Sequence, residues 1–170
     1  MSHLLGQRDT RRCSIGAEYC PYCASERWSL VAALSRFGTF DGLQLTTFTH
    51  ADVYPNPPTF TFLNSYTSQY LDILPVETET RSREPLRTPT AAEQLLLTHF
   101  DPPGSIPFID VGNRYVGVGG GNSNDASSGK TWTAVAASLA NSDSLVSRSI
   151  VGNANYLTAS PALTADLAER

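Results

Sequence analysis

The sequence is short of basic residues, and this shortage limits the partners it predicts. Lysine and arginine together number 12 against 16 aspartates and glutamates, which gives a net charge of -4. Because nucleic-acid binding depends on basic contacts to phosphate, this balance argues against a nucleic-acid partner. It also provides no basic face for anionic lipid, so no membrane contact is expected from the chain as written.

Long apolar runs are lacking as well. The longest uncharged run, residues 53–71, contains three prolines and many hydroxyl side chains. It therefore does not resemble a membrane span, which needs about 20 predominantly apolar residues. Residues 1–12 hold a single apolar pair, Leu4 and Leu5, and no signal-peptide core. As written, the chain is expected in the cytoplasm.

Four helices are predicted from apolar residues spaced three and four apart and from start and stop signals. Gly38 is expected to end the first helix as a left-handed cap. Thr90 and Glu93 form a capping box that opens the second helix. The expected ranges are 24–37, 90–100, 132–139, and a last helix from Leu145 that is broken at Gly152 and Pro161.

Strand signals between these helices predict an α/β fold with a small mixed sheet flanked by helices. A β-rich insertion is expected after the second strand. The first strand is expected to be weak or missing, because Ile15 is the only convincing buried strand residue ahead of the first helix. The sequence therefore predicts a poorly structured or truncated segment over 1–14 and one domain over 15–170. The expected strands are 43–48, 59–63, 70–76 and a hairpin of 106–111 with 115–118 through Gly112-Asn113.

A cysteine pair, Cys20-Pro21-Tyr22-Cys23, lies where the first helix should begin. Helix N-terminal N–H groups and the macrodipole stabilise a thiolate, lowering a free-thiol pKa of about 8.5 to roughly 3.5–7.5 in such pairs. Cys20 is expected to be the exposed nucleophile. Cys23, one turn further, is expected to be the buried resolving thiol that closes the disulfide.

Two plainer interpretations of the pair are weaker. A permanent disulfide across a two-residue spacer would constrain little of the unfolded chain. A zinc site would need two more ligands, and only Cys13 and three scattered histidines remain. No metal or other cofactor is therefore expected. Gly129-Lys130-Thr131 resembles the end of a phosphate-binding loop, but the glycine that this loop requires is Asn124 here.

Ile106-Pro107 offers an independent signal. A proline at the start of a strand is awkward unless it has a special geometry, and a cis peptide bond would provide one. Taken with the cysteine pair and the following hairpin, this dipeptide is expected to be cis.

The stretch Gly16-Ala17-Glu18-Tyr19-Cys20-Pro21-Tyr22-Cys23-Ala24-Ser25-Glu26-Arg27-Trp28 resembles the active-site region of the thioredoxin-like domain of unknown function 929 family. Further stretches that resemble this family bring the similarity to roughly residues 15–157. They are Asp52-Val53-Tyr54-Pro55-Asn56, Thr59-Phe60-Thr61-Phe62, Tyr66-Thr67-Ser68, Pro75-Val76-Glu77 and Ile106-Pro107-Phe108-Ile109-Asp110-Val111-Gly112-Asn113-Arg114-Tyr115.

The resemblance implies a thioredoxin-like fold in which Cys20 and Cys23 form a redox pair and Pro107 is the cis-proline. Substrate contacts are expected from Pro21, Tyr22 and Ile106. Members of this family commonly carry a membrane anchor before the domain, so a truncated start would imply an extracytoplasmic, anchored protein. Thioredoxins use a buried acid near the resolving thiol, and Glu18 and Glu26 are the substitutes nearest in sequence.

The expected function is a thiol–disulfide oxidoreductase acting on protein or small-molecule disulfides, with a redox partner that restores the pair. The alternative is a degenerate, non-catalytic thioredoxin-like binding module, favoured by the weak first strand and the missing acid. Cys13 lies seven residues before Cys20. Because a disulfide needs Cα atoms within about 7 Å, Cys13 is expected to be neither redox partner nor resolving thiol. It should act as a small buried hydrophobe or lie exposed in a frayed segment.

Overall fold

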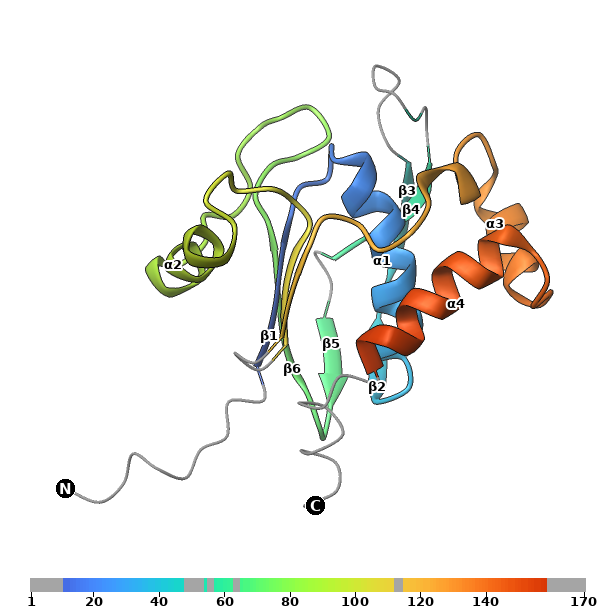
Figure 1. Cartoon of the computed structure of the whole chain (residues 1–170), viewed down its shortest axis with the longest axis horizontal. Coiled ribbons are helices and arrows are strands. Elements are labelled where there is room, and N and C mark those ends of the chain that lie inside the picture. The colour runs from blue at the N-terminus through green and yellow to red at the C-terminus, as the bar shows by residue number, and fades with distance from the viewer. Residues whose placement is uncertain (1–10, 48–53, 55–56, 63–64, 112–114, 159–170) are drawn as a thin grey trace.

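The fold is a mixed α/β arrangement, seen in a computed structural model that describes residues 11–47, 54, 57–62, 65–111 and 115–158. Its main sheet has four strands, in the order β6 (Asp72–Glu77), β1 (Arg11–Gly16), β7 (Phe108–Val111) and β8 (Tyr115–Val118). The α-helices are α1 (Pro21–Leu34), α2 (Ala91–Phe100), α3 (Trp132–Leu139) and α4 (Leu145–Thr158). Helix α2 covers one side of the sheet, and α1 with α4 lies on the other (Figure 1). The predicted α/β class is confirmed.

The first strand is present, and the prediction that it is weak or missing is wrong. β1 begins at Arg11 and lies inside the sheet, parallel to β6 and antiparallel to β7. Residues 11–14, expected in the poorly structured segment, therefore belong to the sheet. Backbone hydrogen bonds to β6 and β7 stabilise this strand on both edges, although few of its side chains favour a strand. Cys13 and Ile15, two positions apart, share one face of β1. They pack in a core cluster with Phe108 of β7 and Leu97 of α2.

The β-rich insertion lies between α1 and β6, ahead of the second strand of the main sheet rather than after it. The strand predicted at 43–48 is β3 (Gln44–Thr47), which pairs only with β4 (Pro58–Thr61). A further antiparallel pair, which the sequence did not indicate, joins β2 (Gly38–Asp41) to β5 (Ser65–Ser68). The parallel neighbour of β1 is therefore β6, about sixty residues further along the chain.

Gly38 has a different role from the predicted helix cap. Helix α1 already ends at Leu34, and Gly38 opens β2 without a positive φ. A Cβ at this position would lie 2.3 Å from the carbonyl oxygen of Thr67 and 2.6 Å from the hydroxyl of Tyr66. Gly38 is required by the close approach of β5, because no side chain fits there.

The remaining helices follow their sequence signals closely. The Thr90–Glu93 capping box is present at the start of α2, and α3 spans its predicted range. Helix α4 continues through Gly152, where a break was expected. Open space around Gly152 and the packing of Val146, Ile150 and Ala154 explain this continuity, since tertiary contacts outweigh the cost of one glycine. Pro161 and the Gly112-Asn113 turn lie outside the described residues.

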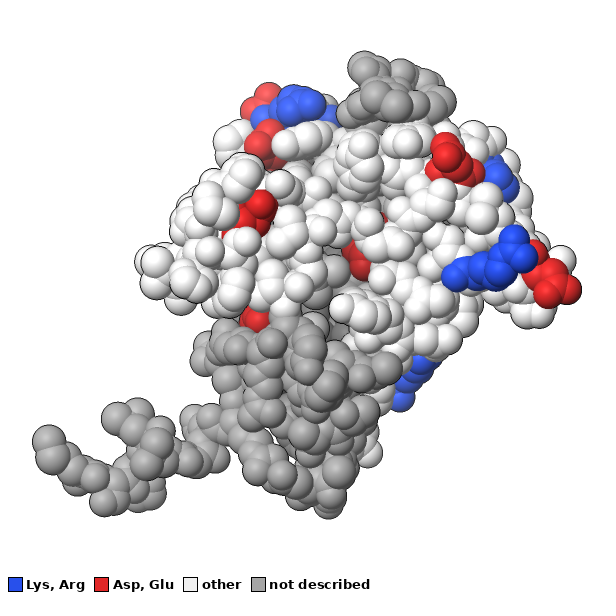
Figure 2. Space-filling view, viewed as in Figure 1, with Lys and Arg blue, Asp and Glu red and all other residues white. Residues whose placement is uncertain are grey.

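Helix α1 is the centre of the larger core. The ring of Trp28 packs against Phe60 of β4 at 4.6 Å between centroids, and its Nε1–H donates to the carbonyl of Pro58 at 2.7 Å. Thr59 donates from its hydroxyl to the carbonyl of Ala24 at 2.7 Å. The insertion thus packs directly against α1. On the surface in Figure 2, the described Lys and Arg side chains are dispersed rather than gathered on one element.

Candidate active site

Cys20 is the N-cap residue of α1. Its backbone is extended, with φ -80° and ψ 120°, and its sulfur accepts a hydrogen bond from the backbone N–H of Cys23 at 3.2 Å. Pro21 begins the helix, where its missing N–H costs nothing. Negative charge at a helix N-terminus is favoured by the free N–H groups and the macrodipole. A thiolate on Cys20 is therefore placed where the helix stabilises it.

The two thiols differ in acidity. The hydrogen bond from the Cys23 thiol lowers the pKa of Cys20, with help from backbone N–H groups and the charge of Arg27, against the opposing effect of burial. Burial raises the pKa of Cys23 well above its ordinary value, and the hydrogen bond and charge of Cys20 add to this. The reduced pair thus combines a readily ionised sulfur at the helix start with a protonated sulfur one turn inside.

Cys20 is more enclosed than expected. The sequence predicted an exposed nucleophile, but Cys20 is only 4% exposed and Cys23 is 2% exposed. Tyr19 and Ile106 pack against the small cluster that both cysteines form with Ala17. The N-cap position places Cys20 at the helix end, where Tyr19 and Ile106 add to its enclosure.

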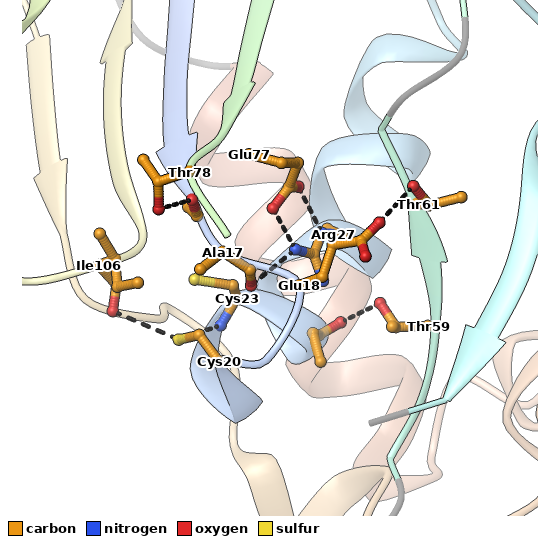
Figure 3. A network of polar contacts seen from close by, with 12 residues as sticks. Ala17, Glu18, Cys20, Cys23, Arg27, Thr59, Thr61, Glu77, Thr78 and Ile106 are labelled. Carbon is orange, nitrogen blue, oxygen red and sulfur yellow. Dashed lines mark hydrogen bonds and ion pairs between the residues drawn. The ribbon is translucent and has the colours of Figure 1, made fainter. Parts of the chain in front are cut away.

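Ile106 and Pro107 meet the cysteine pair. The peptide bond between them is cis, which confirms the prediction, and Pro107 is buried. The Cys20 thiol donates to the carbonyl oxygen of Ile106 at 3.8 Å (Figure 3). Two segments 86 positions apart in the sequence are therefore brought together at one sulfur.

The two residues between the cysteines differ in exposure. Pro21 is buried, whereas Tyr22 is 49% exposed. The ring of Tyr22 makes an edge contact with the ring of Tyr54, with centroids 6.2 Å apart. Of these two, only Tyr22 offers a side chain to an incoming molecule, and the substrate-binding role of Pro21, Tyr22 and Ile106 stays a prediction.

A buried ion pair beside the cysteines was not predicted. Arg27 donates from Nε to Oε1 of Glu77 at 2.9 Å and from Nη2 to Oε2 at 2.7 Å, and its Nη2 also donates to the carbonyl of Ala17 at 3.0 Å. Both side chains are almost fully buried, at 3% and 5% exposure. The available signal was spacing, because Arg27 follows Cys23 by four residues and so shares its face of α1. Glu77 ends β6, and nothing in the local sequence links it to Arg27.

The two acids expected to serve the resolving thiol have other partners. Glu18 accepts from the hydroxyl of Thr61 at 3.0 Å. Glu26 accepts from the backbone N–H of Gly121 at 2.8 Å and from the side-chain amide of Asn153 at 2.7 Å. Burial raises the pKa of Glu26, and these two hydrogen bonds oppose the rise. Glu26 therefore joins α1 to α4 and to the loop that contains Gly121.

Cys13 lies apart from the pair. It is a free, buried thiol on β1, packed in a different core cluster from Cys20 and Cys23. Burial, followed by the charges of Glu93 and Asp110, raises the pKa of Cys13 to about 12. The small buried residue anticipated from the sequence is what this position shows.

A cavity of about 280 Å³ lies between α1, the insertion and the main sheet. Its wall is mostly aliphatic and aromatic, and it includes Cys13 but neither Cys20 nor Cys23. It is therefore distinct from the candidate active site. Within the described residues, no three His, Cys, Asp or Glu side chains are grouped so that they could hold a metal ion.

Comparison with known families identifies the family of the chain. The chain matches the family described as Domain of unknown function (DUF929) over residues 7–104, more than half of its length. The protein belongs to this family. The matched region contains β1, the cysteine pair, Arg27 and Glu77, and ends just before Ile106.

No curated protein and no solved structure matches the chain. Among the described residues, no helix has the length and apolar character needed to cross a membrane.

Proposed function

We propose that the protein is a thiol–disulfide oxidoreductase of thioredoxin-like fold, with Cys20 as nucleophile and Cys23 as resolving thiol. The observation that carries the proposal is the N-cap position of Cys20, whose sulfur accepts the Cys23 N–H at 3.2 Å and has a lowered pKa. The thioredoxin-like assignment is supported by the parallel β1–β6 pair, the β7–β8 hairpin and the cis Ile106–Pro107 bond against Cys20.

The chemistry consists of two thiol–disulfide exchanges. The Cys20 thiolate attacks one sulfur of a substrate disulfide, forming a mixed disulfide and releasing the other substrate sulfur as a thiolate. Cys23 then loses its proton and attacks the Cys20 sulfur, which releases the second substrate thiolate. Two electrons pass from the cysteine pair to the substrate, and the pair becomes a disulfide. A dithiol partner restores it by the reverse exchanges.

The contact between the Cys20 thiol and the Ile106 carbonyl bears on how a substrate enters. With Cys20 only 4% exposed, an incoming disulfide must displace Tyr19 or Ile106 to reach the sulfur. Tyr22, exposed between the two cysteines, offers an aromatic side chain to the part of the substrate that flanks the reacting sulfur.

The same burial favours a second candidate, a non-catalytic thioredoxin-like binding module. In that case the covered thiols would be structural and the face around Tyr22 would bind a partner. One reason for this alternative has gone, because β1 is formed and central. A neutral-pH thiolate on Cys20 would argue against the module and for the oxidoreductase.

An assay of insulin reduction with dithiothreitol as electron donor tests the proposal. We expect the wild-type protein and Cys13→Ser to accelerate the reduction, because Cys13 lies in a different cluster from the pair. Cys20→Ser should show only the rate of dithiothreitol alone. Equal rates for wild type and Cys20→Ser would count against the oxidoreductase and favour the binding module.

A further inference from the structure

Arg27 is a buried charged side chain on the helix that carries the cysteine pair. It follows Cys23 by four residues and Cys20 by seven, so the three lie along one side of α1. Its side chain is 3% exposed. Nε and Nη2 donate to Glu77 and to the carbonyl of Ala17, while Nη1 has no hydrogen-bond partner in the described part of the chain.

Gly16 lies beside both the resolving thiol and this ion pair. A Cβ at Gly16 would lie 3.3 Å from Sγ of Cys23 and 3.7 Å from Oε2 of Glu77. Cys23 and Glu77 therefore both lie against Gly16 at the end of β1. The close-up of Figure 3 shows Cys23, Arg27 and Glu77 in one region around Ala17. No side chain at Gly16 separates the sulfur from the charges.

We propose, on the basis of the dithiol chemistry above, that Arg27 is a positioning residue whose buried guanidinium, oriented by Glu77, stabilises negative charge on the cysteine pair. In the resolving step Cys23 gives up its proton, its thiolate forms the bond to Cys20, and the bond from Cys20 to the substrate breaks. The departing substrate thiolate takes up the proton. Arg27 exchanges no proton and supplies only its fixed positive charge.

Electrostatics supports this role. A charge buried away from water acts through a lower effective dielectric than one at the surface, so it is felt more strongly. The charge of Arg27 is one of the causes that lower the pKa of Cys20, and it opposes the rise in the pKa of Cys23. Glu77 raises the pKa of the Arg27 guanidinium against the lowering effect of burial, which keeps it charged. For Cys23, the charge of Arg27 offsets part of the penalty of burial.

Two substitutions, one in each member of the ion pair, should shift the pKa of Cys20 in opposite directions. A purely structural role of the ion pair would not produce opposite shifts. Arg27→Gln removes the positive charge and should raise the pKa of Cys20, slowing its alkylation below that pKa by at least about 10-fold. Glu77→Gln removes the negative charge that faces the Arg27 guanidinium. It should therefore lower the pKa of Cys20 and make its alkylation at the same pH faster. The measurement is the rate of iodoacetamide modification of Cys20 in the reduced protein between pH 4 and 9, read by peptide mass spectrometry.

Arg36→Gln is the matched control. It removes one arginine just beyond the far end of α1, where the side chain contacts Asn155 and Thr158. Its alkylation profile should equal that of wild type. Arg27→Lys keeps the charge and should restore the rate to within about threefold of wild type. If Arg27→Gln does not fold, Glu77→Gln decides the sign by itself: faster alkylation supports the proposal, and slower or unchanged alkylation overturns it.

The proposal is overturned if Arg27→Gln and Glu77→Gln shift the profile in the same direction, or if neither folded variant shifts it. These outcomes differ from failure of the oxidoreductase function itself. In that case the wild-type Cys20 and Cys23 would not interconvert between dithiol and disulfide, whatever the variants show.

Discussion

Arg27 and Glu77 join the helix that carries the cysteines to the edge strand β6 through two hydrogen bonds of 2.9 and 2.7 Å. The residues are 50 positions apart, so the whole insertion must fold between them. β6 also pairs with β1, the strand that precedes Cys20. The ion pair therefore links α1 back to the sheet on the other side of the cysteine pair.

Breaking this pair should destabilise the protein. Arg27→Ala would leave the carboxylate of Glu77 buried without its partner, and removing one member of a buried pair costs about 3–5 kcal/mol. Urea unfolding monitored by circular dichroism measures the loss. Arg36→Ala, which removes exposed contacts to Asn155 and Thr158, should cost under about 1 kcal/mol. Equal losses in the two variants would show that the Arg27 pair is not a buried, dry interaction.

The stability of the reduced protein should depend on the ionisation of Cys20. Its pKa is lowered in the folded state, so the unfolded state binds more protons between that pKa and about 8.5. The stability that Cys20 contributes is therefore full above pH 8.5 and is lost as the pH falls through the folded pKa. Under reducing conditions, the unfolding free energy of wild type relative to Cys20→Ser should rise from pH 6 to 8.5. A flat or falling difference would contradict the lowered pKa.

Glu26 should give a pH dependence of the opposite sign. Because burial raises its pKa, the folded state binds more protons than the unfolded state above about pH 4.3, and stability falls as the pH rises through the folded pKa. Glu26→Gln removes this ionisation. Urea unfolding from pH 4 to 7 should therefore show a decline in wild type that the variant lacks. If both decline in parallel, the carboxyl of Glu26 is not the group responsible.

Removal of the resolving thiol should trap substrate. In Cys23→Ser, the mixed disulfide on Cys20 cannot be released by attack from inside the protein, so it should persist through non-reducing electrophoresis. Cys13→Ser serves as the comparison and should accumulate no such species, because Cys23 remains. A trapped adduct on Cys13 rather than on Cys20 would show that Cys20 is not the nucleophile and would contradict the proposal.

The local signals of the sequence predicted local structure well. Thr90 with Glu93 marks the start of α2, and the cysteine pair marks the start of α1. The cis bond at Ile106–Pro107 was also predicted, from a proline at a strand start taken together with the cysteine pair and the hairpin that follows.

Features set by distant parts of the chain were missed. β1 has few strand-forming side chains, and it exists because β6 and β7 bond both of its edges. The Arg27–Glu77 pair and the enclosure of Cys20 by Ile106 depend on contacts across 50 and 86 positions. Gly38 was assigned to a helix end, since the approach of Thr67 and Tyr66 cannot be read from its neighbours in sequence.

The most direct measurement of the central claim is a redox titration of the full chain in glutathione buffers, with alkylation and peptide mass spectrometry at each potential. We predict one reversible two-electron transition that interconverts the Cys20–Cys23 dithiol and disulfide, while Cys13 stays a thiol throughout and Cys13→Ser gives the same midpoint. Persistence of Cys20 and Cys23 as unlinked thiols across the whole range, or pairing of Cys13 with Cys20, would contradict it.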